Sequence, residues 1–135
     1  MNITALTYRQ TQSLRAILDP LLEKPLVFSN FDLETTHRRI KTGQYLPVAL
    51  FDMDMLVGVL ICELAPDAVH VVLMGGENLP DDWKDEVVPM LKELAKDQDK
   101  QAVQLDGRPG WQRLLTRFGC KLDNYGERVF MTVSV

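Results

Sequence analysis

Apolar residues near the start of the chain recur at helical spacing. Pro20 interrupts this stripe and removes a backbone donor, so we expect a kink or a restart there, with Asp19 able to cap. A second helix is predicted to begin after an N-cap at Asp32 and to end at Gly43. The apolar positions of the first helix, which share one face, are Leu14, Ile17, Leu18, Leu21 and Leu22.

From residue 48 the apolar positions form continuous runs rich in β-branched residues, and such runs predict strands. Residues 48–51 and 55–64 are two of these runs, and Asp52-Met53-Asp54 between them predicts the turn of a hairpin. Further strands are predicted at residues 2–6, 68–74, 102–105 and 128–135. The strand at residues 68–74 leads into the pair Gly75-Gly76.

Two more helices are predicted in the second half of the chain. The first has apolar positions at Trp83, Val87, Met90, Leu91 and Leu94. Pro89 lies within it, so either the helix kinks or a short turn precedes a helix that starts near Val88. The second has apolar positions at Trp111, Leu114, Leu115 and Phe118, and Gly119 ends it.

This order of elements predicts the fold class. An early antiparallel hairpin followed by strand-helix-strand crossovers indicates an α+β fold with a mixed, mostly antiparallel sheet and helices on both faces. The chain has 135 residues with no internal repeat, low-complexity tract or long linker, so we expect one domain over residues 1–135. A composition of 46% hydrophobic and 25% charged residues is typical of folded, water-soluble proteins.

Several classes of protein and site are not expected. The longest apolar stretch, Met55 to Cys62, is too short to span a bilayer, and the N-terminus lacks the features of a signal peptide. Cys62 and Cys120 are therefore interpreted as reduced core thiols. Two cysteines and two histidines at scattered positions match no zinc-binding spacing, so no metal site is predicted. A net charge of −4 argues against nucleic acid as a partner.

The charge is unevenly distributed along the chain. Residues 63–99 carry ten acidic residues and three lysines, a net charge of −7, which leaves +3 for the remainder. Two interpretations stay open: solvated helix faces, or two surface patches of opposite sign that favour head-to-tail or hetero-association.

The order of elements resembles the GNAT superfamily of N-acetyltransferases. The resemblance rests on two early helices, on the hairpin formed by residues 48–51 and 56–59, and on the helix that follows the strand ending in glycines. In the last third of the chain, the run from Asp106 to Trp111 is similar to small acetyltransferase-like proteins of tailed phages and prophages.

The resemblance implies a binding site for acetyl-CoA. In that superfamily, backbone amides after the fourth strand and the following helix N-terminus hold the cofactor's pyrophosphate, as a free helix start suits an anion. If the cofactor binds, the residues placed against it are Leu73, Met74, Gly75, Gly76 and Asn78.

The corresponding segment of this chain is acidic. No lysine or arginine stands directly before Gly75 in this segment, and Lys84 is the sole cation within it that opposes its acids. Two like charges about 6 Å apart at an effective dielectric of about 20 repel by roughly 3 kcal/mol, which is about two powers of ten in affinity. We therefore expect a degenerate acetyl-CoA site. The acids concerned are Glu77, Asp81, Asp82, Asp85 and Glu86.

The catalytic residues are not identified by the sequence, which offers only weak candidates. Glu63, at the end of a strand, is a candidate general base or an exposed strand-end carboxylate. Tyr125 is a candidate acid for the leaving thiolate, although Asn124-Tyr125-Gly126 is typical of a turn. His70 is expected to be half-buried or at a sheet edge, and His37 to be solvated.

The basic C-terminal region supplies the candidates for a protein interface, which are Arg108, Trp111, Arg113 and Arg117. Trp111 is either a core anchor or a residue that dominates binding to a partner. Arg108 either binds an anion or pairs with an acid inside the fold.

Two functions from different classes remain. The first is a non-catalytic, acetyltransferase-fold component of a phage particle or of its assembly, located in the bacterial cytoplasm or in the particle. Its partners would be phage structural proteins or further copies of the chain. The alternative is an acetyl-CoA-dependent enzyme that moves an acetyl group to an amine.

Overall fold

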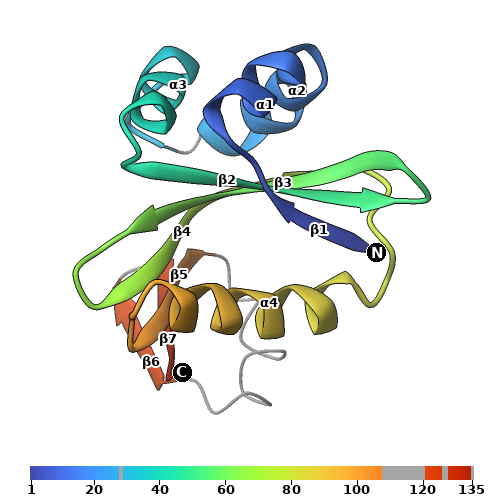
Figure 1. The fold of residues 1–135 in the computed structure, drawn as a ribbon. Helices are drawn as coiled ribbons and strands as arrows, with labels where there is room; N and C mark the ends of the chain where they lie inside the picture. The colour runs from blue at the N-terminus through green and yellow to red at the C-terminus, as the bar shows by residue number, and fades with distance from the viewer. Residues whose placement is uncertain (28, 108–120, 126–127, 135) are drawn as a thin grey trace. The chain divides into compact units, whose positions relative to one another are not determined.

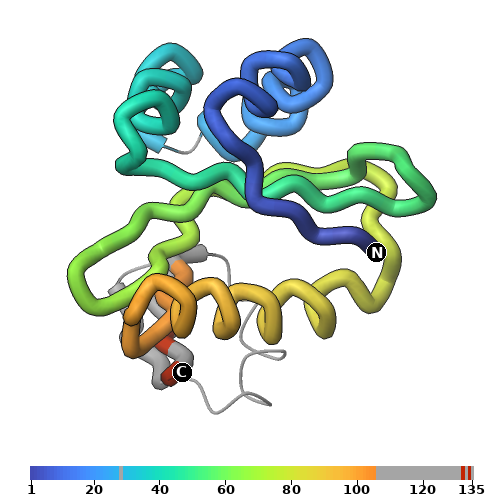
Figure 2. Tube along the Cα trace, in the orientation of Figure 1, coloured from blue at the N-terminus to red at the C-terminus, as the bar shows by residue number. Residues whose placement is uncertain are grey.

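The computed structural model describes residues 1–27, 29–107, 121–125 and 128–134, and its chain path is drawn in Figures 1 and 2. The chain forms two compact units. Unit 1 comprises Met1–Glu63 and Leu73–Asp81, and unit 2 comprises Leu64–Val72 and Asp82–Val135. Strand β4, Ala68–Gly76, contributes its first half to unit 2 and its second half to unit 1. The prediction of a single domain stays a prediction.

The sheet of unit 1 contains β1 (Asn2–Ala5), β2 (Tyr45–Asp52), β3 (Met55–Leu64) and the second half of β4, in that order. β2 pairs antiparallel with both β1 and β3, so that Ile3 lies opposite Leu50 and Val48 opposite Leu60. The strands predicted at residues 2–6, 48–51 and 55–64 are confirmed. Their continuous apolar runs are explained by burial, because Val48, Leu50 and Leu60 are fully buried.

The turn between β2 and β3 has a strained backbone. Met53 and Asp54 both have positive φ, 49° and 65°. A two-residue hairpin turn of this kind matches the right-handed twist of the strands, and it favours Asn-Gly because other residues crowd their Cβ in this conformation. The sequence places a methionine where the backbone would prefer asparagine.

We expect Met53→Asn with Asp54→Gly to stabilise the protein by about 0.5–2 kcal/mol, because both residues accept positive φ more readily. Urea denaturation at neutral pH measures the gain. Met53→Leu is the control, since leucine keeps the crowded side chain. An equal gain from leucine would contradict the explanation from backbone strain.

Three helices of unit 1, α1 (Tyr8–Ser13), α2 (Arg15–Leu26) and α3 (Leu33–Lys41), lie on the same side of β2 and β3 (Figure 1). α3 begins after Asp32, as predicted, and the backbone N–H of Thr35 donates to the Asp32 carboxylate at 2.8 Å. This hydrogen bond lowers the pKa of Asp32 below its ordinary value.

Of the two outcomes expected at Pro20, a kink or a restart of the helix, the restart does not occur. α2 runs through Pro20 and Pro25, and the break between the first two helices falls earlier, at Leu14. Leu18 and Leu22 on either side of Pro20 are both buried, and this packing stabilises the helix where its local sequence does not. The role expected for Asp19 as a cap is also wrong.

Asp19 instead belongs to a buried polar network with His37. The Nε2 atom of His37 lies 2.7 Å from Oδ1 of Asp19, and its Nδ1 lies 3.3 Å from Nε2 of Gln12. Arg15 donates to the second oxygen of Asp19 at 2.9 Å. His37 is 6% exposed, so the expectation that it is solvated is wrong. The network joins all three helices of unit 1.

Replacing His37 with leucine removes one partner of a largely buried carboxylate. We expect His37→Leu to destabilise the protein by about 1–3 kcal/mol, because Asp19 then loses a hydrogen bond without regaining water. His37→Gln, whose amide can still donate, should cost less. Urea denaturation of both variants at pH 7 checks this, and equal losses would mean that the hydrogen bond contributes nothing.

Unit 2 contains the first half of β4 followed by α4 (Trp83–Asp97), β5 (Ala102–Gly107), β6 (Lys121–Tyr125) and β7 (Arg128–Ser134). Its strand order is β4-β5-β7-β6. β4 and β5 are parallel, and β7 is antiparallel to both β5 and β6. α4 packs on β5 and buries Val87, Leu91 and Ala95. The strands predicted at residues 68–74 and 102–105 are confirmed, and so is the one predicted at 128–135 over its described residues, Arg128–Ser134.

The helix predicted over Trp83 to Leu94 is present as α4. It is continuous from Trp83 through Pro89, so the alternative of a separate helix that starts near Val88 is excluded. The segment Lys121–Tyr125 was not predicted as a strand, because its polar residues show no alternation, yet it pairs with β7. Tyr125 is therefore the last residue of β6 and lies opposite Arg128. The helix predicted around residues 111–118 lies outside the described residues.

The structure confirms a mixed α+β fold with a mostly antiparallel sheet. None of the described helices is long and apolar enough to cross a membrane. Cys62 is a buried free thiol, as predicted, and burial raises its pKa to about 12. Cys120 lies outside the described residues.

Candidate functional site

The segment expected to contact a cofactor is the end of β4 and the residues that follow it, all within unit 1. Leu73 and Gly75 are buried and Met74 is half-buried, whereas Gly76 and Asn78 are exposed. Asn78 has a φ of 58°, which turns the chain sharply after the strand. The five predicted cofactor residues therefore lie along the end of one strand and the turn after it, and they differ in burial.

The absent side chain of Gly75 makes room for helix α2 rather than for a ligand. A Cβ atom built on Gly75 would overlap the backbone carbonyl oxygen of Leu21. This carbonyl is available because its usual helical donor would be the N–H of residue 25, and Pro25 has none. The proline ring also crowds that carbonyl and turns it away from the helix. The close approach of α2 therefore requires glycine at position 75.

The open side of Gly76 is filled by Leu79. A Cβ atom on Gly76 would lie 2.6 Å from Cδ1 of Leu79 and 3.0 Å from the carbonyl oxygen of Val57. The same leucine lies against Gly58, where a Cβ would be 3.1 Å from its Cδ2. The backbone N–H of Glu77 donates to the carbonyl of Val57 at 2.8 Å. The Leu79 side chain thus fills the space beside Gly76, and the first N–H after β4 is already hydrogen-bonded.

The charge of this segment is negative and partly compensated from α2. The Nζ atom of Lys24 lies 3.5 Å from Oε1 of Glu77, and both side chains are largely exposed. Such an exposed pair contributes about 0–1 kcal/mol to stability. Its consequence here is electrostatic, because Glu77 neutralises a lysine that would otherwise attract an anion. Asp81 is exposed and adds a further negative charge.

The start of α4 in unit 2 is also acidic. Its first turn carries Asp85 and Glu86, and the N-cap residue is Asp82. The carbonyl of Asp82 accepts the N–H of Asp85 at 3.0 Å, and Lys84 places its ammonium 5.7 Å from the centre of the Trp83 ring. These carboxylates complement the positive end of the helix dipole, which is the role that a bound phosphate would take.

The residues present do not fit acetyl-CoA held in the expected manner. A pyrophosphate needs backbone N–H groups that are free to donate, glycines that allow close approach, and positive potential. Here the Glu77 N–H is already bonded, Leu21 and Leu79 lie against the two glycines, and the surrounding charge is negative. We therefore derive no catalytic step through this cofactor.

The other candidates are placed as follows. Glu63 is half-buried in β3 opposite Tyr45, not the exposed carboxylate of one interpretation. His70 is half-buried in β4 opposite Gln104, in line with its prediction. Of Tyr125 only the backbone is described. Arg108, Trp111, Arg113 and Arg117 lie outside the described residues, so their interface roles stay predictions.

A cluster of Arg39, Tyr45 and Phe31 was not predicted from the sequence. Nη1 of Arg39 donates to the hydroxyl of Tyr45 at 2.7 Å, and its guanidinium lies over the rings of Tyr45 and Phe31 at 5.4 and 5.2 Å from their centres. The unbonded Leu21 carbonyl was not predicted either. Pro25 stands four residues after Leu21, the spacing of a helical hydrogen bond, so the sequence did contain this information.

Solved structures of acetyltransferases share the fold of this chain. An IAA acetyltransferase from Bacillus cereus matches with a TM-score of 0.72 and 11% identity over 99% of both chains. The aminoglycoside 6′-N-acetyltransferase from Enterococcus faecium has a TM-score of 0.71 and 13% identity over 99% of this chain and 97% of its own. The PaiA N-acetyltransferase from Thermoplasma acidophilum, solved with coenzyme A, has a TM-score of 0.66 and 10% identity over the full length of both chains.

The chain has the fold of the GNAT acetyltransferases. A scan against protein-family models finds no match, and neither does a search of the curated proteins. At these identities the likeness shows the fold alone, and a shared acetyltransferase fold hosts sites of different chemistry. The phage-type resemblance of residues 106–111 is not among these findings.

A double-mutant cycle of Gly75 and Pro25 tests the contact between α2 and β4. Gly75→Ala should cost about 1–3 kcal/mol, since the new methyl group overlaps the Leu21 carbonyl. Pro25→Ala supplies an N–H that draws this carbonyl back into the helix. In the Pro25→Ala protein, Gly75→Ala should therefore lower the free energy of unfolding by about 1 kcal/mol less than in the wild-type protein. Urea denaturation of the four proteins gives the coupling energy.

Gly76→Ala is the matched control, because its Cβ overlaps chiefly the flexible end of Leu79, and the backbone atom it approaches, the Val57 carbonyl oxygen, is 3.0 Å away. Gly76→Ala should lower the free energy of unfolding less than Gly75→Ala does. Additive losses from Gly75→Ala and Pro25→Ala would refute the link between the proline and the glycine.

Proposed function

We propose that this protein uses an acetyltransferase fold with a degenerate acetyl-CoA site and acts through contacts with other proteins, without catalysis. The observation that supports this most directly is that the end of β4 is packed internally. The Leu21 carbonyl lies against Gly75, and Leu79 lies against Gly76. The Glu77 N–H is bonded to Val57.

The energy needed to open this segment is considerable. Freeing the Glu77 N–H breaks a hydrogen bond worth about 1 kcal/mol, and uncovering the half-buried Leu79 side chain costs about 1 kcal/mol. Together these amount to roughly a thirtyfold loss of affinity. Repulsion between a pyrophosphate and the carboxylates of Glu77 and Asp81 adds to that loss.

The partners belong to the same proposal. The resemblance of residues 106–111 to phage and prophage proteins favours phage structural proteins or further copies of this chain. The corresponding location is the bacterial cytoplasm or a phage particle. The competing function, acetyl transfer to an amine, is supported by the fold and by the coenzyme A complex of the Thermoplasma acidophilum protein.

Calorimetric titration with acetyl-CoA separates these functions. We expect a dissociation constant weaker than about 1 mM for this protein, and no thiol release when acetyl-CoA and a polyamine or an aminoglycoside are added. Glu77→Gln removes one negative charge but leaves the packed glycines, so it should not restore binding. An N-acetyltransferase known to bind acetyl-CoA serves as the positive control.

Binding in the micromolar range, or thiol release above the uncatalysed rate, would overturn the proposal in favour of the enzyme. Strong binding by Glu77→Gln alone would show that charge, and not packing, closes the site.

A further inference from the structure

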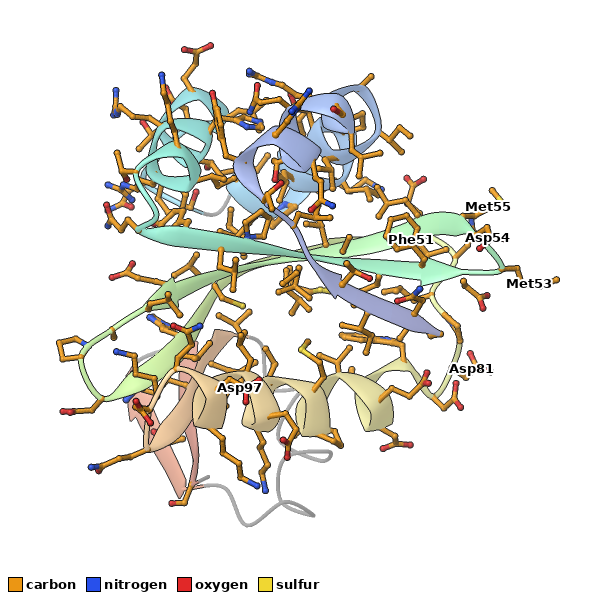
Figure 3. All side chains as sticks on the ribbon, viewed as in Figure 1. Phe51, Met53, Asp54, Met55, Asp81 and Asp97 are labelled. Carbon is orange, nitrogen blue, oxygen red and sulfur yellow. The ribbon has the colours of Figure 1, made fainter. Side chains whose placement is uncertain are left out.

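Two methionines at the end of the β2–β3 hairpin are strongly exposed. We define the hairpin tip as Asp52–Met55, in which Met53 is 91% and Met55 70% exposed. Figure 3 shows the two side chains at the outer end of the hairpin, with Asp54 between them. The tip therefore holds the two methionines that are most open to solvent in the described part of the chain. The other methionines whose side chains the structure describes are half-buried, and they are Met1, Met74 and Met90.

Met53 is placed against the preference of its backbone. Its φ of 49° belongs to a turn that favours asparagine or glycine, and the side chain gains almost no burial in return. Asparagine would suit this turn better, and leucine would give a similar apolar surface. Only methionine supplies a thioether sulfur. The reactivity of that sulfur is therefore the property that distinguishes methionine at this position.

A thioether sulfur that a peroxide can reach is converted into a sulfoxide. A lone pair on the sulfur attacks one oxygen of hydrogen peroxide, so that an S–O bond forms and the O–O bond breaks. The proton of the attacked hydroxyl passes to the departing hydroxide, which leaves as water. The sulfur loses two electrons and the peroxide gains them. Methionine sulfoxide reductases reverse the change, with a thiol as the reductant.

We propose that Met53 and Met55 form a reversible oxidation site, at which a peroxide converts the exposed thioethers into sulfoxides while the protein stays folded. The proposal goes beyond the proposed function and does not depend on it. Oxidation turns the apolar side chains of the hairpin tip into polar ones. It therefore weakens any contact that buries these two methionines.

The surroundings of the two side chains explain why the fold tolerates the added oxygen. A sulfoxide disrupts packing where it lies in a core, but neither Met53 nor Met55 is buried. Met55 lies opposite Asp52 in the hairpin, and this pairing uses backbone atoms and not the sulfur. Met74 on β4 and Met90 on α4 are half-buried, so an added oxygen there would displace packed atoms.

Timed oxidation with hydrogen peroxide, followed by peptide mass spectrometry, tests the selectivity of the site. In the folded protein, Met53 and Met55 should gain oxygen at least about tenfold faster than Met74 and Met90, because access to the sulfur sets the rate. The same reaction in guanidinium chloride is the control. Unfolding exposes every methionine, so it should abolish the difference.

Urea denaturation and enzymatic repair test whether the fold survives and whether the change is reversible. A protein oxidised only at the hairpin tip should keep the urea midpoint of the unoxidised protein. A methionine sulfoxide reductase with dithiothreitol should restore both thioethers in the folded protein, because the enzyme can reach exposed side chains. Met53→Leu with Met55→Leu is the matched variant, since leucine keeps the apolar surface and has no sulfur. This variant should gain no oxygen in the time that the wild-type tip needs to react.

Any one of three results would contradict the proposal. The first is oxidation of Met74 or Met90 as fast as that of the hairpin tip in the folded protein. The second is a lower urea midpoint after oxidation of the tip alone. The third is repair of the tip sulfoxides only after unfolding. None of these results bears on acetyl-CoA binding, which the titration tests separately.

Discussion

The backbone contact between α2 and β4 is the constraint on which the candidate site depends. Pro25 leaves the Leu21 carbonyl without its helical donor, and this carbonyl faces Gly75, where a side chain would overlap it. A glycine in a loop after a strand is often interpreted as room for a phosphate. In this chain the room is taken by the protein's own main chain, and the next glycine is covered by Leu79. The helices of unit 1 are thereby held against the end of β4, while the His37–Asp19 pair holds them to one another.

The proposed function implies that an acetyltransferase fold can be kept while its cofactor site is lost. The solved structures that match it over nearly the whole chain do so at 10–13% identity, so the architecture survives almost complete replacement of the sequence. Burial of apolar strands is enough to preserve such an architecture. The ligand site, in contrast, depends on a few free N–H groups and on local charge, both of which single substitutions can remove. The segment after β4 lies within a run of 42 residues, from Thr42 to Trp83, that contains no lysine or arginine.

The sequence predicted the elements with strong periodicity and missed those set by tertiary contacts. β2, β3 and α3 follow from apolar runs and a cap at Asp32, and the structure has all three. β6 was missed because Lys121–Tyr125 carries no apolar pattern and becomes a strand only by pairing with β7. The restart expected at Pro20 was wrong because burial of Leu18 and Leu22 outweighs the lost hydrogen bond. For the site, the sequence located Gly75 and Gly76 and the acidic charge, but the packing of Leu21 and Leu79 on them required three-dimensional information.

The register of β1 has a practical consequence for handling the protein. Asn2 lies opposite Phe51, so the first residue stands beside the end of the β2–β3 hairpin (Figure 1). An affinity tag fused to Met1 would project alongside Met53 and Met55 and shield them from solvent and from other molecules. An affinity tag should therefore be placed elsewhere on the chain when the end of the β2–β3 hairpin is to remain accessible.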